Sequence, residues 1–340
     1  MAGNLSRGAT QELAPSPPAP LLEAAGLTRH FHIGGMRGAT LHAVDGVDLT
    51  IGQREIVAMV GESGSGKSTV ARLLARVYRP SAGEVRFNGR DLGALRRRRD
   101  LLAYRGAVPM VFQDPYSSLN PVHTIGHLLE RGLRLHRGDL DRRGRRAEAE
   151  RVLEAVGLVP APRLLARYPH ELSGGQRQRV GFAQALSYRP SVILADEPVS
   201  MLDVSIRIGL LNLMREMCND EGLSLLYITH DIASARYVAT RIVVMYAGKL
   251  VETGATEDVL REPAHPYTRL LLSAVPDPRA PVSAVDMGEP PKVVDPSPGC
   301  RFRFRCPYAE EICAAVTPEL RTIPFSATRA ACHLAPLPQS

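Results

Sequence analysis

The chain has 340 residues, which is enough for one large domain and a smaller one, and its 44% hydrophobic and 23% charged residues are ordinary for a folded protein. No apolar run approaches the roughly 18 residues that a membrane span needs, and the first twenty residues lack the apolar core of a signal peptide. We therefore expect a cytoplasmic protein. The net charge of +7 is concentrated in arginine clusters at 96–99 and 142–146. Because no aromatic residues interleave these clusters, they indicate solvated helix faces, and we predict no nucleic-acid partner.

The first part of the chain has the pattern of an antiparallel β subdomain. Residues 1–20 are rich in Pro, Ala and Ser and are typical of a disordered tail. An edge strand is predicted at 21–28, and residues 41–51 alternate between apolar and polar with a turn at Asp45–Gly46. A further strand at 84–92 contains the turn signal Asn88–Gly89.

Residues 56–70 are the stretch around which the rest of the chain is organised. An apolar strand at 56–60 leads into the glycine-rich sequence 61–68, and helical spacing begins at Thr69. Strand, glycine-rich turn and helix together are the context of a phosphate-binding loop. Gly64 and Gly66 let consecutive N–H groups point at phosphate oxygens, and the helix N-terminus favours an anion. Lys67 can reach the β- and γ-phosphates, and Ser68 can offer its hydroxyl to Mg²⁺.

Three more apolar strands are predicted, at 107–113, 191–196 and 223–230, and helices separate them. The helices are expected at 121–137, 142–158, 161–172, from about 176 with Ser173 as its N-cap, and at 204–219. Continuous apolar strands alternating with helices indicate an α/β fold with a parallel sheet that is buried on both faces. Ligands then bind at the carboxyl ends of the strands.

Polar residues stand at these strand ends. Asp196 suits the Mg²⁺ shell, and Glu197 can polarise an attacking water. His230 can donate a hydrogen bond to the γ-phosphate, and Gln113 can contact both Mg²⁺ and the water. Taken singly, each residue could be a structural strand-end cap. Their convergence on one phosphate-binding loop instead favours a site that binds phosphate groups and activates a water molecule.

Over about residues 21–262, the sequence resembles the ATP-binding subunits of ABC transporters. GESGSGKS resembles the Walker A loop, VILADE resembles Walker B, and LSGGQ resembles the family signature. The resemblance implies a P-loop NTPase with a RecA-like, mostly parallel core, an antiparallel β subdomain, and a helical subdomain at about 115–190. It also implies catalytic Glu197, His230 and Gln113, and Mg²⁺ at Ser68, Gln113 and Asp196. The implied ATP contacts are Phe31, Gly61, Ser63, Gly64, Gly66, Lys67, Ser68, Thr69, Ser173, Gly174, Gly175, Gln176 and Asp203.

The resemblance further implies a head-to-tail dimer of two such ATPase subunits, identical or paralogous. ATP would lie between residues 61–68 of one subunit and 173–176 of the other. This arrangement is physically reasonable because LSGGQ is a second glycine-rich helix N-terminus, which can bind the γ-phosphate from the far side. Loss of that phosphate on hydrolysis would release the two subunits.

More narrowly, residues 113–121 (QDPYSSLNP), 265–268 (HPYT) and the cysteine-rich end resemble the oligopeptide/dipeptide/nickel importers. The resemblance implies two permease partners, an extracytoplasmic solute-binding protein, and a peripheral position on the cytoplasmic face of the membrane. Residues 263–340 would be a C-terminal extension. The alternatives are a non-transport ABC ATPase, a subunit that does not hydrolyse ATP, or an importer of nickel or oligosaccharides.

Four of the five cysteines lie near the C-terminus, at Cys300, Cys306, Cys313 and Cys332. The spacing matches neither a zinc ribbon nor a common ferredoxin, so free thiols and a metal site both remain open. The resemblance implies a [4Fe–4S] cluster, with zinc as the alternative and His333 as a further possible ligand. We expect Arg301, Arg303 and Arg305 to offset the charge of the cluster, and the ATP site to be independent of it. The fifth cysteine, Cys218, is predicted to be a core residue.

Overall fold

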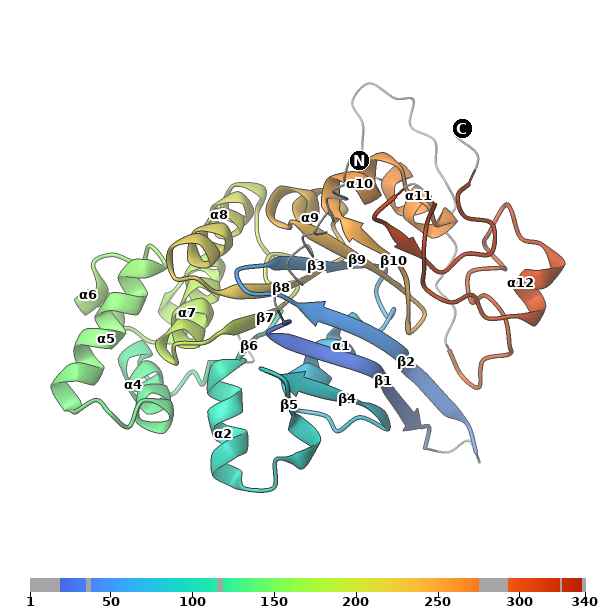
Figure 1. Ribbon diagram of the computed structural model, residues 1–340. Coiled ribbons are helices and arrows are strands. Elements are labelled where there is room, and N and C mark those ends of the chain that lie inside the picture. Colours follow the sequence, from blue (N-terminus) through green and yellow to red (C-terminus); the bar gives the residue numbers. More distant parts are fainter. Residues whose placement is uncertain (1–18, 35–37, 115–118, 275–292, 325, 338–340) are drawn as a thin grey trace, which may run out of the picture.

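A computed structural model of the chain describes residues 19–34, 38–114, 119–274, 293–324 and 326–337. Most of the predicted tail and residues 115–118 of the QDPYSSLNP motif lie outside the described residues. The chain forms two sheets with helices between and around them (Figure 1). None of the described helices combines the length and the apolar character that crossing a membrane requires.

The first sheet is antiparallel and has the order β2-β1-β4-β5. Its strands are β1 (Leu22–His32), β2 (Thr40–Ile51), β4 (Ala82–Phe87) and β5 (Arg90–Asp91). Two predictions here are wrong. The first strand is not an edge strand, because β1 pairs with both β2 and β4. The expected turn at Asp45–Gly46 is instead an irregularity in the β1–β2 register, and β2 continues through it because Gly46 adopts a φ of 67°.

The second sheet has the order β11-β12-β10-β9-β3-β8-β7-β6. Strands β9, β3, β8, β7 and β6 are parallel, as predicted, and β10, β12 and β11 are antiparallel. The strands are β3 (Ile56–Val60), β6 (Met110–Val111), β7 (Val192–Asp196), β8 (Ser224–Thr229), β9 (Arg241–Tyr246), β10 (Lys249–Ala255), β11 (Arg321–Thr322) and β12 (Arg329–Ala330).

Both faces of this sheet are buried. Along β3, Val57 and Met59 face a core shared with the first sheet, and Ala58 and Val60 face a second core on the other side. Helix α1 (Lys67–Leu74) packs into the first core and therefore lies between the two sheets. This packing explains why these strands read as continuous apolar runs.

The second core is covered by helices that also form a separate lobe, on the left in Figure 1. The lobe contains α4 (Ile125–His136), α5 (Arg142–Ala155), α6 (Ala161–Leu165) and α7 (Gly174–Ser187), and α8 (Val204–Asp220) and α9 (Ile232–Val238) follow it. Cys218 is buried in this core, where burial raises the pKa of its thiol to about 12. The prediction of a structural cysteine is confirmed.

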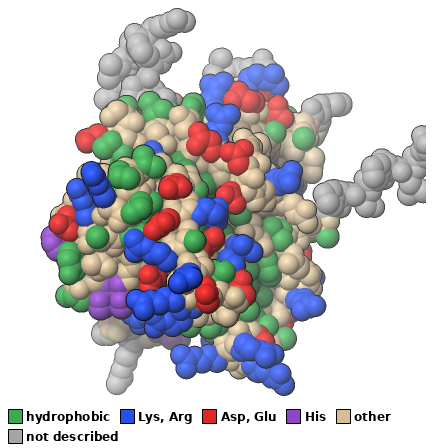
Figure 2. All heavy atoms as spheres, turned by 90° about the vertical axis from the view of Figure 1, so that its left-hand side faces the viewer, with side chains coloured by type: hydrophobic (Ala, Val, Ile, Leu, Met, Phe, Trp, Pro, Cys, Tyr) green, Lys and Arg blue, Asp and Glu red, His purple; other side chains and the backbone are tan. Residues whose placement is uncertain are grey.

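On the face that the lobe presents in Figure 2, cationic and anionic side chains are interspersed. Arg146 pairs with Glu150 at 2.8 Å, and Arg151 pairs with Glu148 at 3.0 Å. These pairs are typical of a solvated helix surface.

The C-terminal part packs against the outer edge of the second sheet, on the right in Figure 1. It contains α10 (Thr256–Arg261), α11 (Pro266–Ser273) and α12 (Glu311–Ala315), and β12 extends the sheet by pairing with β10. Phe302 is fully buried against Tyr246 and Tyr267. The cysteine-containing segment is therefore docked on the core and is not a separate appendage.

Candidate functional site

A cleft opens at the carboxyl ends of the parallel strands. The register pairs Val60 with Thr229, and Asp196 with Ile228, so the strand ends lie side by side. The cleft is lined by residues that include Phe31, His42, Ala43, Glu62, Ser63, Gly64, Gly66, Lys67, Ser68, Thr69, Gln113, Glu197 and His230. The structure thus brings together most of the site residues that the sequence predicts.

The phosphate-binding loop depends on two glycines. Gly61 has a φ of 155°, and a Cβ there would meet the carbonyl oxygen of Met245 at 2.1 Å. Gly66 has a φ of 106°, and a Cβ there would meet the carbonyl oxygen of Ala43 at 2.2 Å. Lys67 donates to the carbonyl oxygens of Gly61 at 2.7 Å and Glu62 at 2.8 Å. Burial lowers the pKa of Lys67, and the nearby carboxylates of Glu197, Asp196 and Glu62 oppose this shift.

Ser68 and Asp196 form a pair of oxygen donors suited to Mg²⁺. The Ser68 hydroxyl donates to Asp196 Oδ1 at 2.8 Å, although the two residues are 128 positions apart. Burial raises the pKa of Asp196, and the hydrogen bond from Ser68 opposes that rise. A hydroxyl and a carboxylate this close are hard oxygen ligands for Mg²⁺ beside a phosphate site. The donor set therefore fits the ion.

Glu197 directly follows β7 and is oriented by two neighbours. Its Oε2 lies 3.3 Å from Gln113 Nε2 and 3.2 Å from His230 Nδ1. The Glu197 backbone has a φ of 45°, which is uncommon for a residue with a side chain and is typical of functional sites. Its own N–H donates to the carbonyl of Ile228 at 2.9 Å, which anchors the turn on β8.

The LSGGQ residues do not line this cleft. Ser173 is the predicted N-cap of α7: it accepts from the N–H of Gln176 at 3.3 Å, and the Gln176 side chain accepts from the N–H of Ser173 at 3.0 Å. Ser173 itself is exposed, and Gly175 packs under Ile206. Asp203, the N-cap residue of α8, is also exposed and away from the cleft.

The four C-terminal cysteines, by contrast, are brought together. Cys300 donates its N–H to the carbonyl of Cys313 at 2.7 Å. Burial raises the pKa values of Cys300, Cys306 (to about 11) and Cys332, and each of the three is raised further by the charge of other cysteines in the group. These cysteines also accept backbone hydrogen bonds, for example Cys306 from Tyr308. His333 is turned away, with Nε2 at 2.9 Å from the carbonyl oxygen of Val316.

The prediction that three arginines offset a charge at the cysteines is wrong for two of them. Arg301 and Arg305 do not face the cysteines to offset a charge there. Arg301 is bonded to Asp45 in β2, and Arg305 forms two 2.8 Å hydrogen bonds with Glu62 in the phosphate-binding loop. Arg303 donates to Ser297 and to the carbonyl of Cys300. The cysteine segment is thus in direct contact with the nucleotide cleft, although hundreds of residues separate the two in sequence.

One further group of described side chains could hold a metal ion by proximity alone, namely His30, His42 and Asp45. Asp45 is already paired with Arg301 and lies 3.9 Å from Lys249 Nζ. The two side-chain cations beside the Asp45 carboxylate disfavour binding of a metal cation there, so this group forms an ion-pair network.

The fold and the cleft together define a phosphate-binding-loop nucleoside triphosphatase. A family model described as ABC transporter matches residues 44–200, and one described as oligopeptide/dipeptide transporter, C-terminal region, matches residues 251–313. The structure is similar to a dimeric ATP-binding cassette solved after hydrolysis with ADP and Pi. The TM-score is 0.62 at 29% identity, over 69% of this chain and 98% of that one.

Relatives extend the match over almost the whole chain. The oligopeptide transport ATP-binding protein AppF of Bacillus subtilis is 42% identical over 297 residues, 86% of this chain and 89% of that protein. An ATP-binding protein of Brucella ovis, provisionally named for peptide import, is 42% identical over 307 residues, 89% and 95% of the two chains. The chain belongs to the ABC transporter ATP-binding proteins, in the group with the oligopeptide/dipeptide transporter C-terminal region, and it is an ATPase.

Proposed function

We propose that this chain is the ATPase subunit that drives peptide import through partner permeases in the membrane. The observation that carries the proposal is that one chain contains both a nucleotide cleft and the C-terminal region of the oligopeptide/dipeptide transporter group. The names of the relatives support peptides as the solute class. Two permeases, an extracytoplasmic binding protein and a peripheral position on the cytoplasmic face complete the proposed assembly.

Within the chain, we infer an ATP-binding domain at 21–262, whose helical subdomain at about 115–190 carries the signature, and an extension at 263–340. ATP binds with its base against Phe31, which contacts Tyr78 edge-on at 5.6 Å, and with its phosphates on residues 61–69. Ser68, Asp196 and Gln113 would hold Mg²⁺, which would offset the charge of the phosphates. Glu197 accepts a proton from the attacking water, and His230 exchanges its contact with Glu197 for one with the γ-phosphate.

A second subunit supplies the signature residues in this proposal. Ser173, Gly174, Gly175, Gln176 and Asp203 lie outside the cleft of their own chain, and Ser173 and Asp203 are exposed. In a head-to-tail dimer, the N-terminus of α7 would cap the γ-phosphate bound to the partner's loop. The dimeric cassette among the structural relatives supports this arrangement.

The proposal is tested by Lys67→Ala. Loss of a charge-assisted contact to phosphate costs about 1.5–3 kcal/mol, or roughly 10- to 150-fold in ATP affinity. We expect titration with a fluorescent ATP analogue to show this loss, and uptake of a labelled oligopeptide by cells carrying the variant to fall to background. The control is Arg261→Ala, which removes an exposed cation of α10 outside the cleft lining. Unchanged ATP affinity in Lys67→Ala would exclude this loop as the site, and normal uptake would exclude peptide import by this chain.

We also propose that Cys300, Cys306, Cys313 and Cys332 hold a [4Fe–4S] cluster. Of these four described cysteines, no three have their Sγ atoms within 4.8 Å of one another. A single tetrahedral zinc ion would require S–S separations of roughly 3.8 Å, whereas a four-iron cluster holds its ligands further apart. Backbone N–H groups directed at three of the sulfurs lower their pKa values and so oppose the rise that burial causes, which makes the thiolate form that a metal needs easier to reach.

Metal analysis tests the cluster. Protein purified without oxygen should be brown and contain iron and sulfide in near-equal amounts. Replacing any one of the four cysteines by Ser should bleach it and increase proteolysis within 300–332, while Cys218→Ser should keep the colour. If the analysis finds one zinc ion and no iron, the four cysteines bind zinc and not a cluster. Absence of any metal from anaerobic protein would refute both.

A further inference from the structure

The loop between Cys300 and Cys306 reaches the phosphate-binding loop. Arg305 and Glu62 form a bidentate ion pair, in which Nη1 lies 2.8 Å from Oε2 and Nη2 lies 2.8 Å from Oε1. The side chains are only 14% and 12% exposed. A pair so shielded from water is costly to break, because loss of one partner leaves a desolvated charge behind.

Glu62 is held at two further points. Its N–H donates to the hydroxyl of Tyr267 at 2.8 Å, and its carbonyl oxygen accepts from Lys67 Nζ at 2.8 Å. Tyr267 is fully buried and packs on Phe302, which belongs to the same loop as Arg305. The conformation of the phosphate-binding loop at Glu62 is therefore set by C-terminal side chains.

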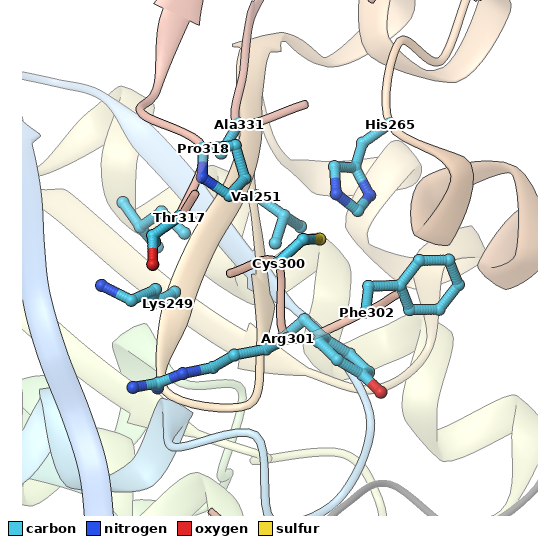
Figure 3. A pocket seen from close by; sticks show the side chains of 11 residues that line it. Lys249, Val251, His265, Cys300, Arg301, Phe302, Thr317, Pro318 and Ala331 are labelled. Atoms are coloured by element: carbon cyan, nitrogen blue, oxygen red, sulfur yellow. The ribbon is translucent and has the colours of Figure 1, made fainter. Parts of the chain in front are cut away.

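Arg301, from the same loop, holds the other side of the cleft. Figure 3 shows Arg301 and Phe302 extending in opposite directions, with Phe302 towards His265 and Arg301 on the side of Lys249. Arg301 donates to the carboxylate of Asp45 and to the carbonyl of Ala247, and its side chain is 9% exposed. Asp45 lies in β2 two positions from Ala43, which lines the cleft.

We propose that Arg305 and Arg301 are positioning residues for ATP: Arg305 fixes the phosphate-binding loop and neutralises Glu62, and Arg301 anchors β2. The proposal rests on the assignment of the cleft to ATP made above. Glu62 itself lines that cleft, so its carboxylate lies beside the site of the triphosphate. Without Arg305, two groups of the same sign would face each other across a poorly screened site. Arginine suits this role better than lysine because its planar fork binds both carboxylate oxygens.

Arg305→Ala tests the proposal directly. We expect the affinity for the ATP analogue to fall about tenfold and the KM for ATP to rise, with kcat nearly unchanged. Arg303→Ala is the matched control, because the hydrogen bonds that Arg303 donates within the described part of the chain go to Ser297 and to the carbonyls of Pro298 and Cys300, none of which lines the cleft. Its ATP affinity should equal that of the wild type. Thermal unfolding of both variants shows whether the fold is retained.

A second substitution separates charge from structure. Glu62→Gln removes the carboxylate charge, so the double variant Arg305→Ala with Glu62→Gln should recover most of the lost affinity. Wild-type affinity in Arg305→Ala, or no recovery in the double variant, would overturn the proposal. Lys67→Ala, measured in the same assay, separates the test of the ATP site from the test of the positioning role. If Lys67→Ala binds ATP with wild-type affinity, the cleft is not the ATP site. If Lys67→Ala loses affinity but Arg305→Ala does not, only the positioning role of Arg305 is refuted.

Discussion

Replacing Glu197 by Gln is expected to reduce ATP hydrolysis by about 10²- to 10⁴-fold, the usual contribution of a general base. Gln keeps the size of the side chain and can still contact Gln113 and His230, which lie 3.3 and 3.2 Å from the carboxylate. ATP binding should therefore persist, and the ATP-bound dimer should accumulate. Phosphate release measures the first effect, and size-exclusion chromatography with ATP measures the second.

A surface carboxylate provides the control for this experiment. Glu257→Gln changes an exposed residue that is paired with Arg236 and does not line the cleft, and it should leave hydrolysis unchanged. A Glu197→Gln variant that turns over ATP at the wild-type rate would show that another group accepts the proton.

Replacing Ser173 by Arg is expected to abolish the ATP-dependent dimer while leaving ATP binding to the single chain intact. Ser173 lies at the exposed N-terminus of α7, outside the cleft of its own chain. In the head-to-tail arrangement, the long cationic side chain would occupy the space of the partner's γ-phosphate. Light scattering with the Glu197→Gln background, which retains ATP, measures the dimer directly.

The Ser173 side chain also caps α7, so the loss of the cap must be separated from the added bulk. Ser173→Ala removes the same hydrogen bond, at a cost of about 1 kcal/mol in stability, without filling the interface. We expect this variant to retain the dimer. Dimerisation of Ser173→Arg with ATP at wild-type concentrations would contradict the head-to-tail arrangement.

The nucleotide cleft could be predicted because its signals are local. The glycines before Lys67 stand in fixed order, and Asp196 and His230 each end or follow an apolar run. A parallel sheet then brings the strand ends to one edge whatever the intervening helices do. The prediction thus needed only the type of each element and the position of its end.

The sequence pattern was less informative for a helix that is rich in charged residues but has one buried side. Helix α2 (Arg98–Ala107) was not predicted, since it begins inside the arginine run 96–99. One of its tertiary contacts is made by Tyr104, whose buried hydroxyl donates to the carbonyl of Leu74. The apolar residues 107–113 were read as one strand, but Ala107 ends this helix and only Met110–Val111 pair with β7.

The contacts between the C-terminal segment and the cleft could not be read from sequence at all. Arg301 and Asp45 are 256 residues apart, and Arg305 and Glu62 are 243 residues apart. The neighbouring sequence does not distinguish an arginine that offsets the negative charge of a metal site from one that binds a distant carboxylate. Proximity in sequence suggested the cysteines as partners, and the packing of Phe302 on Tyr246 and Tyr267 directs the arginines elsewhere.

If ATP hydrolysis by this chain drives peptide import, peptide should stimulate hydrolysis in the assembled transporter. The complex isolated through a tag on this chain, with its membrane partners and binding protein in lipid vesicles, is assayed for ATP hydrolysis with and without oligopeptide. We expect peptide to increase the rate, and we expect Glu197→Gln to remove this increase together with the basal rate. A rate that does not respond to peptide, or a peptide response that survives in Glu197→Gln, would contradict this expectation.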